Sequence, residues 1–471
     1  MGRGNGMITT FPTFTAALDH RLRPAAAAPL AVGFSGGGDS LALLILTLDW
    51  ARGHGRAVVS LTVDHQLNPA SAAWTAAAVA RAQALGVDAR ALAWTGDKPS
   101  TGLPAAARAA RHALLADAAR EAGSHVLLLG HTADDLAEAA AMRAEGSTVS
   151  DPREWSPSPA WPQGRGVFVL RPLLAVGRAE IRDWLSARGE TWLDDPANED
   201  PKYARARARR SLAKNSDPKS LSSRAERSVD PGPRSGAHGP WVPDSLCEAS
   251  GMTTENAAGY LVLPRAALAA HVAVACLCAA GTSAPPRGER LRRLVERIRA
   301  GEDFTATLAG ARIEVAGEAV SFFREPGEVR RSQKPPPVGE VSAQPTDGGV
   351  IERPTPSPTD PSDRLPHGGR VCSRLIVGKP IVWDGRYEIT ALAPGLVVRP
   401  LQGLAARLAP AQRQALKAFP PAARPALPVL VDADGGVSCP ILAEPNATRA
   451  RCLVMDRFGA ALGHVDQEPA T

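Results

Sequence analysis

The segment LAVGFSGGGDSLALLILTLD at residues 30–49 decides the fold, because it joins an apolar run to a glycine-rich turn and then to a second apolar run. Residues 31–34 are predicted to form a buried parallel strand, and the apolar side chains after the turn recur at helical spacing. Three consecutive glycines let the backbone approach a ligand closely, and the helix that follows presents unpaired N–H groups and the positive end of its dipole. The turn SGGGDS is therefore predicted to bind phosphate.

One acidic residue, Asp39, stands inside this turn. Its carboxylate would repel a phosphate group unless a cation lay between them, so Asp39 predicts Mg²⁺. The hydroxyl groups of Ser35 and Ser40 can add hydrogen-bond donors. No lysine follows the last glycine and the glycines do not fit G-x-G-x-x-G, which argues against the P-loop and the dinucleotide fingerprint. A glycine-rich strand–helix turn without a ligand is the alternative interpretation.

Composition sets broad limits on the rest of the chain. A length of 471 residues suggests about three domains. The net charge of +6 and the pI of about 9.2 have the sign expected of a nucleic-acid binder, although charge alone does not identify a partner. The six cysteines form no C-x-x-C pair, which favours a reducing cytoplasm. No signal peptide and no apolar run of membrane-spanning length are evident, so we expect a cytoplasmic protein without a membrane partner.

Short apolar runs alternate with alanine-rich helical segments between residues 57 and 174. This alternation predicts an α/β fold with a doubly wound parallel sheet and a ligand site at the carboxyl ends of its strands. The backbone groups of Thr62 and Val63, at the end of the second strand, are candidate adenine contacts. The fourth strand is followed by GHTADD at residues 130–135, where Asp134 and Asp135 are candidates for binding Mg²⁺ or orienting an amine. The alternative for Asp134 is a simple helix cap.

The turn SGGGDS resembles the pyrophosphate loop of the ATP pyrophosphatase superfamily, whose members cleave ATP to AMP and pyrophosphate in order to adenylate a substrate. Together with GHTADD, it is similar to the tRNA(Ile)-lysidine synthase family. Segments 171–174, 177–192, 194–200 and 203–209 also resemble that family. The resemblance implies that ATP and Mg²⁺ activate the wobble cytidine of an isoleucine tRNA with a CAU anticodon, and that L-lysine then displaces AMP.

The resemblance also implies roles for particular residues. The expected catalytic residues are Asp39, Asp134, Asp135 and Arg205, and Asp39 and Asp134 are expected to hold the metal. The expected ATP-binding residues are Ser35, Gly36, Gly37, Gly38, Asp39, Ser40, Thr62, Val63 and His131. The expected contacts to tRNA or phosphate are Arg171, Lys202 and Arg209. Asp135 or Glu138 is a candidate for positioning the lysine amine.

Two departures from the family pattern bear on the lysine pocket. Leu136 and Ala140 stand where the family usually has Gln and Thr, and residues 144–166 replace a glycine-rich loop. We therefore expect this pocket to be built differently. Trp155 and Trp161 in that segment are candidates either for stacking on bases or for packing in the core.

The chain is predicted to divide into six parts. An N-terminal extension with a first helix (1–27) precedes the catalytic domain (28–212), and a disordered insertion (213–250) follows it. A middle α+β tRNA-binding domain (251–325), a Pro-rich linker (326–370) and a C-terminal tRNA-contacting domain (371–471) complete the chain. The sequence leaves a homodimer possible. It also leaves two alternative functions open. These are a tRNA thiolase, which would need cysteines that the first 246 residues lack, and a non-catalytic RNA-binding relative.

Overall fold

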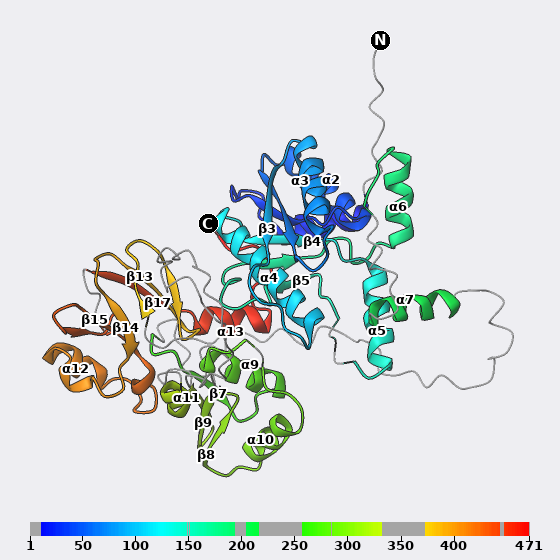
Figure 1. The fold of residues 1–471 in the computed structure, drawn as a ribbon. Coiled ribbons are helices and arrows are strands. Elements are labelled where there is room, and N and C mark those ends of the chain that lie inside the picture. Colours follow the sequence, from blue (N-terminus) through cyan, green and yellow to red (C-terminus); the bar gives the residue numbers. More distant parts are fainter. Residues whose placement is uncertain are drawn as a thin grey trace, which may run out of the picture. The chain divides into compact units, whose positions relative to one another are not determined.

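The computed structural model of the chain describes residues 11–147, 149, 151–193, 204–215, 257–283, 285–331, 373–442 and 447–470. The chain divides into two compact units (Figure 1). The first is Met1–Trp241 with Gly459–Thr471, and the second is Val242–Phe458. The predicted disordered insertion and Pro-rich linker lie outside the described residues, apart from 213–215, which end a helix, and 326–331, which form one. The division into six parts therefore stays a prediction.

A six-stranded sheet forms the centre of the first unit, in the order β3-β2-β1-β4-β6-β5. Five strands are parallel, as predicted, and β5 pairs antiparallel with β6 at the edge. The strands are β1 (Leu30–Gly33), β2 (Val58–Asp64), β3 (Asp88–Ala93), β4 (Val126–Leu129), β5 (Trp155–Pro157) and β6 (Phe168–Leu170).

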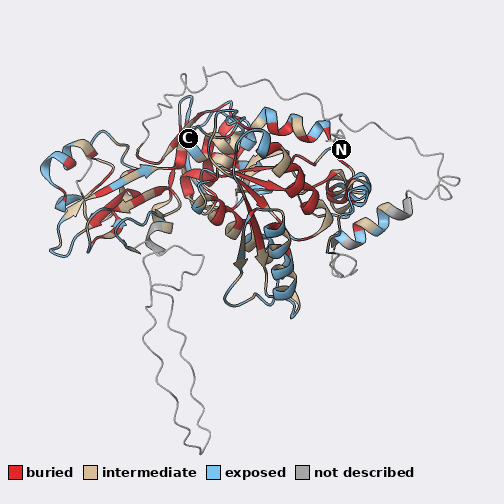
Figure 2. Cartoon of the chain, turned by 90° about the horizontal axis from the view of Figure 1, so that it is seen from above, coloured by how far each residue is buried: buried red, intermediate tan, exposed pale blue. Residues whose placement is uncertain are grey.

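Seven helices accompany this sheet in the described part of the first unit, before the chain enters the second. They are α1 (Pro12–Arg21), α2 (Gly38–Gly53), α3 (Ser71–Ala84), α4 (Leu103–Glu121), α5 (Ala133–Ala144), α6 (Arg178–Ala187) and α7 (Ala204–Asn215). Because side chains alternate across a strand, β1 and β4 contribute to two hydrophobic clusters. Leu30 and Val32 pack with α1, α2 and α6, whereas Ala31 packs with α4 on the opposite face. Figure 2 shows that burial is deepest along the inner strands, since β1 and β4 are almost wholly buried whereas β3 is exposed or half-buried.

The edge strand β5 was not predicted and lies within residues 144–166. Trp155 of this strand stacks on Phe168 with ring centroids 5.0 Å apart, and its indole N–H donates to the carbonyl of Val465 at 2.7 Å. Trp155 is therefore a packing residue, which decides between the two alternatives for this side chain.

The second unit contains three antiparallel sheets, which agrees with the predicted α+β composition. The first sheet is β7-β10-β9-β8, the second is β11-β14-β15-β16 and the third is β12-β13-β17. Its elements are β7 (Leu261–Pro264), α9 (Ala269–Ala280), α10 (Glu289–Arg299), β8 (Phe304–Leu308), β9 (Ala311–Ala316), β10 (Ala319–Arg324), α11 (Pro326–Arg331), β11 (Ser373–Arg374), β12 (Ile381–Trp383), β13 (Tyr387–Ala391), β14 (Val397–Pro400), α12 (Pro410–Leu416), β15 (Pro428–Val431), β16 (Val437–Ser438), β17 (Thr448–Cys452) and α13 (Val454–Leu462). No helix in the described ranges is both long and apolar enough to cross a membrane.

The C-terminal segment returns to the first unit, which the sequence did not predict. Glu468 forms an ion pair with Arg56 at 2.9 Å, and both side chains are only 1% exposed. The carboxylate of Glu468 also accepts the backbone N–H of Arg23 at 2.7 Å. Residues 459–471 thus belong with the sheet domain, although the sequence places them in a C-terminal domain.

Candidate functional site

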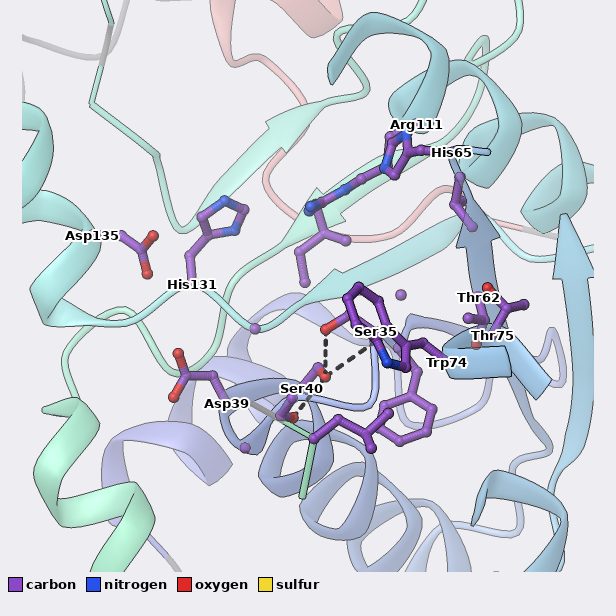
Figure 3. A pocket seen from close by; sticks show the side chains of 18 of the residues that line it. Ser35, Asp39, Ser40, Thr62, His65, Trp74, Thr75, Arg111, His131 and Asp135 are labelled. Atoms are coloured by element: carbon purple, nitrogen blue, oxygen red, sulfur yellow. Dashed lines mark hydrogen bonds between the residues drawn. The ribbon is translucent and has the colours of Figure 1, made fainter. Parts of the chain in front are cut away.

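A cavity of about 1230 Å³ opens at the carboxyl ends of β1, β2 and β4 (Figure 3). The turn between β1 and α2, the end of β2, the start of α3 and the residues after β4 all line it, together with residues of α4, α6 and α7. This is the edge where doubly wound sheets bind their ligands, and the sequence predicted it.

The glycine turn is held in shape by its own serines. The hydroxyl of Ser40 donates to the carbonyl of Gly37 at 2.9 Å and accepts the N–H of Ser35 at 3.2 Å. Ser40 therefore stabilises the turn in this structure instead of offering its proton outward. Five of the six predicted residues line the cavity, namely Ser35, Gly37, Gly38, Asp39 and Ser40.

Gly36, the sixth, is covered by Leu193. Its φ of +84° is a left-handed conformation, and a Cβ built there would lie 2.7 Å from Cδ1 of Leu193. The N–H of Leu193 also donates to the carbonyl of Gly36 at 3.0 Å. Gly36 thus allows the turn to form beneath a covering residue, and Leu193 had no role in the sequence predictions.

Thr62 and Val63 line the cavity beyond the glycine turn, and their contact with adenine stays a prediction. Trp74 and Thr75 of α3 line the same region and were not predicted (Figure 3). The hydroxyl of Thr62 is buried and has no hydrogen-bond partner within the part of the chain that the structure describes. A buried hydroxyl of this kind needs a partner, which a bound nucleobase can supply.

Two predicted metal-binding carboxylates lie at one edge of the cavity. Arg178, the first residue of α6, connects them: its Nε donates to Asp39 at 3.0 Å, and its backbone N–H donates to Asp134 at 2.7 Å. The capping role considered for Asp134 belongs to Asp135 instead, whose carboxylate accepts the N–H of Thr132 at 2.9 Å in a capping box. Asp134 lines the cavity while one of its oxygens accepts the first backbone N–H of α6.

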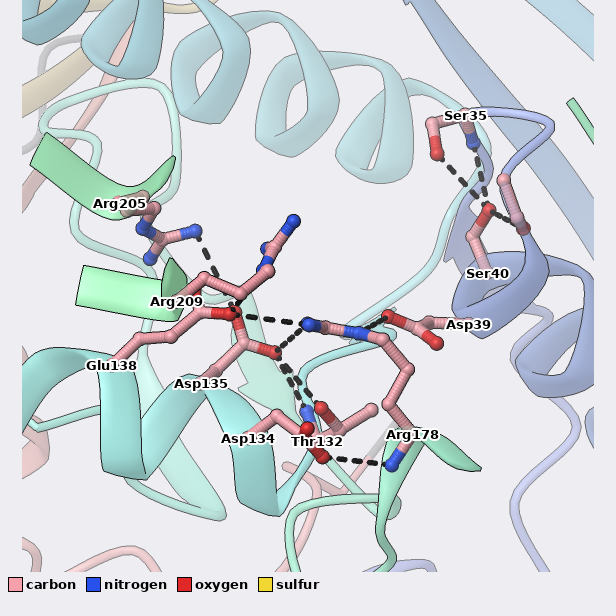
Figure 4. Close-up of polar contacts among 11 residues, drawn as sticks. Ser35, Asp39, Ser40, Thr132, Asp134, Asp135, Glu138, Arg178, Arg205 and Arg209 are labelled. Carbon is pink, nitrogen blue, oxygen red and sulfur yellow. Dashed lines mark hydrogen bonds and ion pairs between the residues drawn. The ribbon is translucent and has the colours of Figure 1, made fainter. Parts of the chain in front are cut away.

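The same arginine extends into a wider charged network (Figure 4). Its Nη1 lies 3.1 Å from Glu138 and its Nη2 lies 3.6 Å from Asp135. Arg209 pairs with Glu138 at 2.9 Å, and Arg205 pairs with Asp135 at 3.5 Å. Sequence reasoning missed Arg178, although a cation in the first turn of a helix opposes the helix dipole and so could have signalled a special role.

Electrostatics differ sharply between the two sides of the cavity. On the acidic side, burial raises the pKa of Asp39 in spite of the ion pair with Arg178. On the basic side, burial together with Arg108 and Arg205 lowers the pKa of Arg111 to about 10. The Nε of Arg111 has no hydrogen-bond partner among the described residues, so an anion in the cavity would stabilise this side chain.

His131 lines the basic side and is neutral. Burial, followed by the charges of Arg171 and Arg111, lowers its pKa to about 2. Its Nδ1 is buried without a partner in the described ranges. A neutral imidazole at this point can exchange hydrogen bonds with a nucleotide without adding charge, which agrees with the predicted ATP contact.

Some predicted residues do not join the site. Arg171 is only 6% exposed, and its guanidinium donates to the carbonyl of Arg153 at 2.7 Å and to the hydroxyl of Ser156 at 3.3 Å. It fastens the segment around β5, so the predicted contact with tRNA does not fit. Lys202 lies outside the described residues. Arg205 and Arg209 line the cavity, whereas no described residue of 144–166 does.

The donor set suits a magnesium ion that arrives with a nucleotide. No group of three or more His, Cys, Asp or Glu side chains that could hold a metal occurs among the described residues. Asp39 and Asp134 offer two carboxylates beside a phosphate-binding turn. Mg²⁺ is commonly bound through one or two carboxylates together with substrate phosphates and water, so these two residues fit that ion.

Comparisons with known proteins show which family the chain resembles over nearly its whole length. A family model described as a PP-loop domain matches residues 11–216. A tRNA(Ile)-lysidine synthase from Caulobacter vibrioides is 50% identical over 462 residues, which covers 97% of this chain and 98% of the relative. A tRNA(Ile)-lysidine synthase from Hyphomonas neptunium is 40% identical over 298 residues, covering 60% and 78%. Among solved structures, a U34-tRNA thiolase from Methanococcus maripaludis has 18% identity and a TM-score of 0.36, covering 43% of this chain and 73% of the thiolase.

Proposed function

Because the chain belongs to the tRNA(Ile)-lysidine synthase family, we propose that it adenylates the wobble cytidine of a CAU-anticodon isoleucine tRNA and joins L-lysine to that base. The proposal rests on one observation. A single cavity brings together a phosphate-binding turn, two carboxylates suited to Mg²⁺ and a set of arginines from α4 and α7. Such a cavity can hold ATP and still admit a second substrate, because about 1230 Å³ exceeds the space that one small ligand needs.

The adenylation step follows from the residues around the turn. Gly37 and Gly38 would hold the β- and γ-phosphates through main-chain N–H groups at the start of α2. The cytosine carbonyl oxygen attacks the α-phosphorus, and pyrophosphate leaves. Arg111 would stabilise the charge that develops on the leaving group, because it lines the cavity and its Nε has no hydrogen-bond partner among the described residues. When bound, Mg²⁺ would neutralise part of the phosphate charge, held by Asp39 and Asp134.

The lysine step needs an amine held close to the activated base. Asp135 suits this role better than Glu138, because Asp135 lines the cavity whereas Glu138 is 2% exposed and is not among the described lining residues. One oxygen of Asp135 is committed to capping α5, and the other lies 3.5 Å from Arg205. We therefore assign the lysine amine to this second oxygen, with Arg205 beside it.

A tRNA thiolase is the second candidate, and the cysteines argue against it. Burial raises the pKa of Cys276 and of Cys278 to about 12 and that of Cys439 to about 11. Thiols with such pKa values are not nucleophiles at neutral pH. A non-catalytic RNA-binding relative is disfavoured as well, since a binder has no need of carboxylates beside a phosphate site.

The decisive experiment incubates the full chain with ATP, labelled L-lysine and CAU-anticodon isoleucine tRNA, and then digests the RNA for mass spectrometry. A lysine-modified cytidine that requires ATP is expected. A sulfur-containing nucleoside would favour the thiolase, and unmodified RNA that is nevertheless bound would favour the non-catalytic relative. A cytoplasmic location and a homodimer stay predictions; the nature of the proposed substrates supports the first.

The assignment of Asp135 has its own test. Asp135→Asn retains an oxygen for the capping box, so the helix should form. We expect tRNA-dependent exchange of pyrophosphate into ATP to continue while lysine incorporation falls by about tenfold or more. Unchanged lysine incorporation would remove Asp135 from this role.

A further inference from the structure

One residue of α6 donates hydrogen bonds to both carboxylates that the proposed reaction needs for its metal ion. Arg178 reaches Asp39 through its Nε and Asp134 through its backbone N–H. Its two terminal nitrogens reach Glu138 and Asp135. Figure 4 shows this guanidinium between the glycine turn and α5, so a single residue contacts Asp39, Asp134, Asp135 and Glu138.

The charges favour this arrangement while no nucleotide is present. The guanidinium of Arg178 forms ion pairs with Asp39 at 3.0 Å and with Glu138 at 3.1 Å. A hydrated Mg²⁺ approaching Asp39 would have to break an ion pair of 3.0 Å and give up some of its own water. The free protein is therefore a poor site for the metal.

A bound nucleotide changes the balance. The triphosphate brings negative charge to the same cavity, which Arg178 also lines, and so offers the guanidinium a new partner beside Asp39. The contact between Arg178 and Glu138 does not have to break, because it uses a different nitrogen. Only the Nε contact must be exchanged.

We propose that Arg178 occupies the cation position in the nucleotide-free protein and leaves Asp39 when a nucleotide arrives with its metal. Arg178 is then a positioning residue that makes metal binding depend on nucleotide binding. This inference rests on the proposed function for the identity of the site, but its consequence concerns metal affinity and can be measured without tRNA or lysine.

The experiment titrates Mn²⁺, as a spectroscopic substitute for Mg²⁺, into the full chain and follows free Mn²⁺ by electron paramagnetic resonance. Wild type should bind Mn²⁺ weakly alone. With α,β-methylene ATP, which cannot be cleaved between its α- and β-phosphates, wild type should bind Mn²⁺ tightly at one site beyond the Mn²⁺ that the same nucleotide binds without protein. In Arg178→Gln, binding without nucleotide should tighten by about 10- to 100-fold. Arg178→Lys, which keeps a cation on α6 and preserves folding, should fall between the two.

Two controls separate this effect from a general change of charge. Arg188→Gln removes the same charge at the C-cap of α6, where the exposed Arg188 is not among the residues that line the cavity, and should leave Mn²⁺ binding near the wild-type value. Adding Asp39→Asn to Arg178→Gln should abolish the gained site. Tight Mn²⁺ binding by nucleotide-free wild type, or unaltered binding by both Arg178 variants, would overturn the inference. Failure of α,β-methylene ATP to bind at all would count against the proposed function instead.

Discussion

Asp39 lies in an environment that disfavours its charged form, because burial raises its pKa above the ordinary value of 3.8. The folded chain thus holds this proton more firmly than the unfolded chain does. Folding stability from this group is present at low pH and is lost as the pH rises through the window above 3.8. At neutral pH the charged carboxylate of Asp39 therefore lowers the free energy of unfolding.

Asp39→Asn should separate the effect of this carboxylate on activity from its effect on stability. The amide cannot hold a divalent cation, so pyrophosphate release should fall by roughly a hundredfold or more. The free energy of unfolding at neutral pH should be unchanged or slightly higher, because the raised pKa already includes the opposing effect of Arg178. Calorimetry beside a pyrophosphate assay measures both quantities. Marked destabilisation at neutral pH would show that the carboxylate is needed for folding.

Two buried histidines predict sensitivity to acid. Burial and neighbouring arginines lower the pKa of His112 to about 3 and that of His131 to about 2, from an ordinary value of 6.5. Both must take up a proton on unfolding below pH 6.5, so the stability they contribute is complete above 6.5 and is lost as the pH falls. The loss should reach about 1.4 kcal/mol per pH unit for each histidine.

Two variants test this prediction, one at a buried histidine and one at an exposed histidine. The measurement is the slope of the free energy of unfolding against pH. His112→Gln should flatten the slope below pH 6.5, whatever it does to stability at neutral pH. His20→Gln, at an exposed position on α1, should leave the slope as in wild type. Equal slopes in wild type and His112→Gln would contradict the prediction.

At the residue level, the sequence predicted which residues of the glycine turn line the cavity, but it did not predict which residues contact them. Asp39 and Asp134 were predicted because a carboxylate beside a phosphate turn has few explanations, and both line the cavity. Arg178 was missed because its contacts come from α2 and α5, far away along the chain. Arg171 was misjudged for a related reason: an arginine in sequence carries no sign of whether its guanidinium faces RNA or a backbone carbonyl.

The elements β4 and α2 approach each other closely where the site is built. A Cβ on Gly130, just after β4, would lie 3.1 Å from the carbonyl oxygen of Asp39 and 3.2 Å from Cα of Ser40. Gly130→Ala should therefore displace the first turn of α2 by a few tenths of an ångström and lower pyrophosphate release by several- to about tenfold. Folding should survive, since the strand itself is unchanged.

Gly177→Ala provides the matched control, because no described atom lies within 4 Å of a Cβ at the N-cap of α6. This variant should keep near-normal pyrophosphate release. Equal losses in the two variants would show that the close contact at Gly130 does not set the position of Asp39.

The parallel strands and their helices could be predicted because each carries a long apolar pattern of period 2 or 3.6. The strand β5 could not. It has three residues, ends in proline and exists only through its pairing with β6. Its neighbourhood lies outside the cavity, so the expected rebuilding of the lysine pocket by this segment finds no support among the described lining residues.

On the scale of the whole molecule, the last residues of the chain pack against the first unit and stabilise it. Breaking the buried pair between Glu468 and Arg56 leaves an unpaired guanidinium, which typically costs about 3 kcal/mol or more. Glu468→Ala should thus lower the unfolding temperature of this unit and weaken hydrogen-exchange protection of β1 and β2. Asp466→Ala, whose side chain is 81% exposed, should have little effect. Identical behaviour of the two variants would remove the stabilising role of Glu468.

This closure joins residues separated by 412 positions, and no local pattern in the sequence marks such a pair. Charged side chains near a terminus ordinarily indicate solvent exposure, which is why the segment was assigned to a separate domain.

If the proposed function is correct, the cavity cleaves ATP between its α- and β-phosphates in order to activate a tRNA. The most direct measurement follows ATP labelled at the α-phosphorus, with the full chain, L-lysine and either the CAU-anticodon isoleucine tRNA or the same tRNA with uridine at the wobble position. Labelled AMP should form only with the wobble cytidine, in amounts equal to the lysine incorporated. Labelled ADP, or AMP that forms equally well with the uridine tRNA, would contradict the claim.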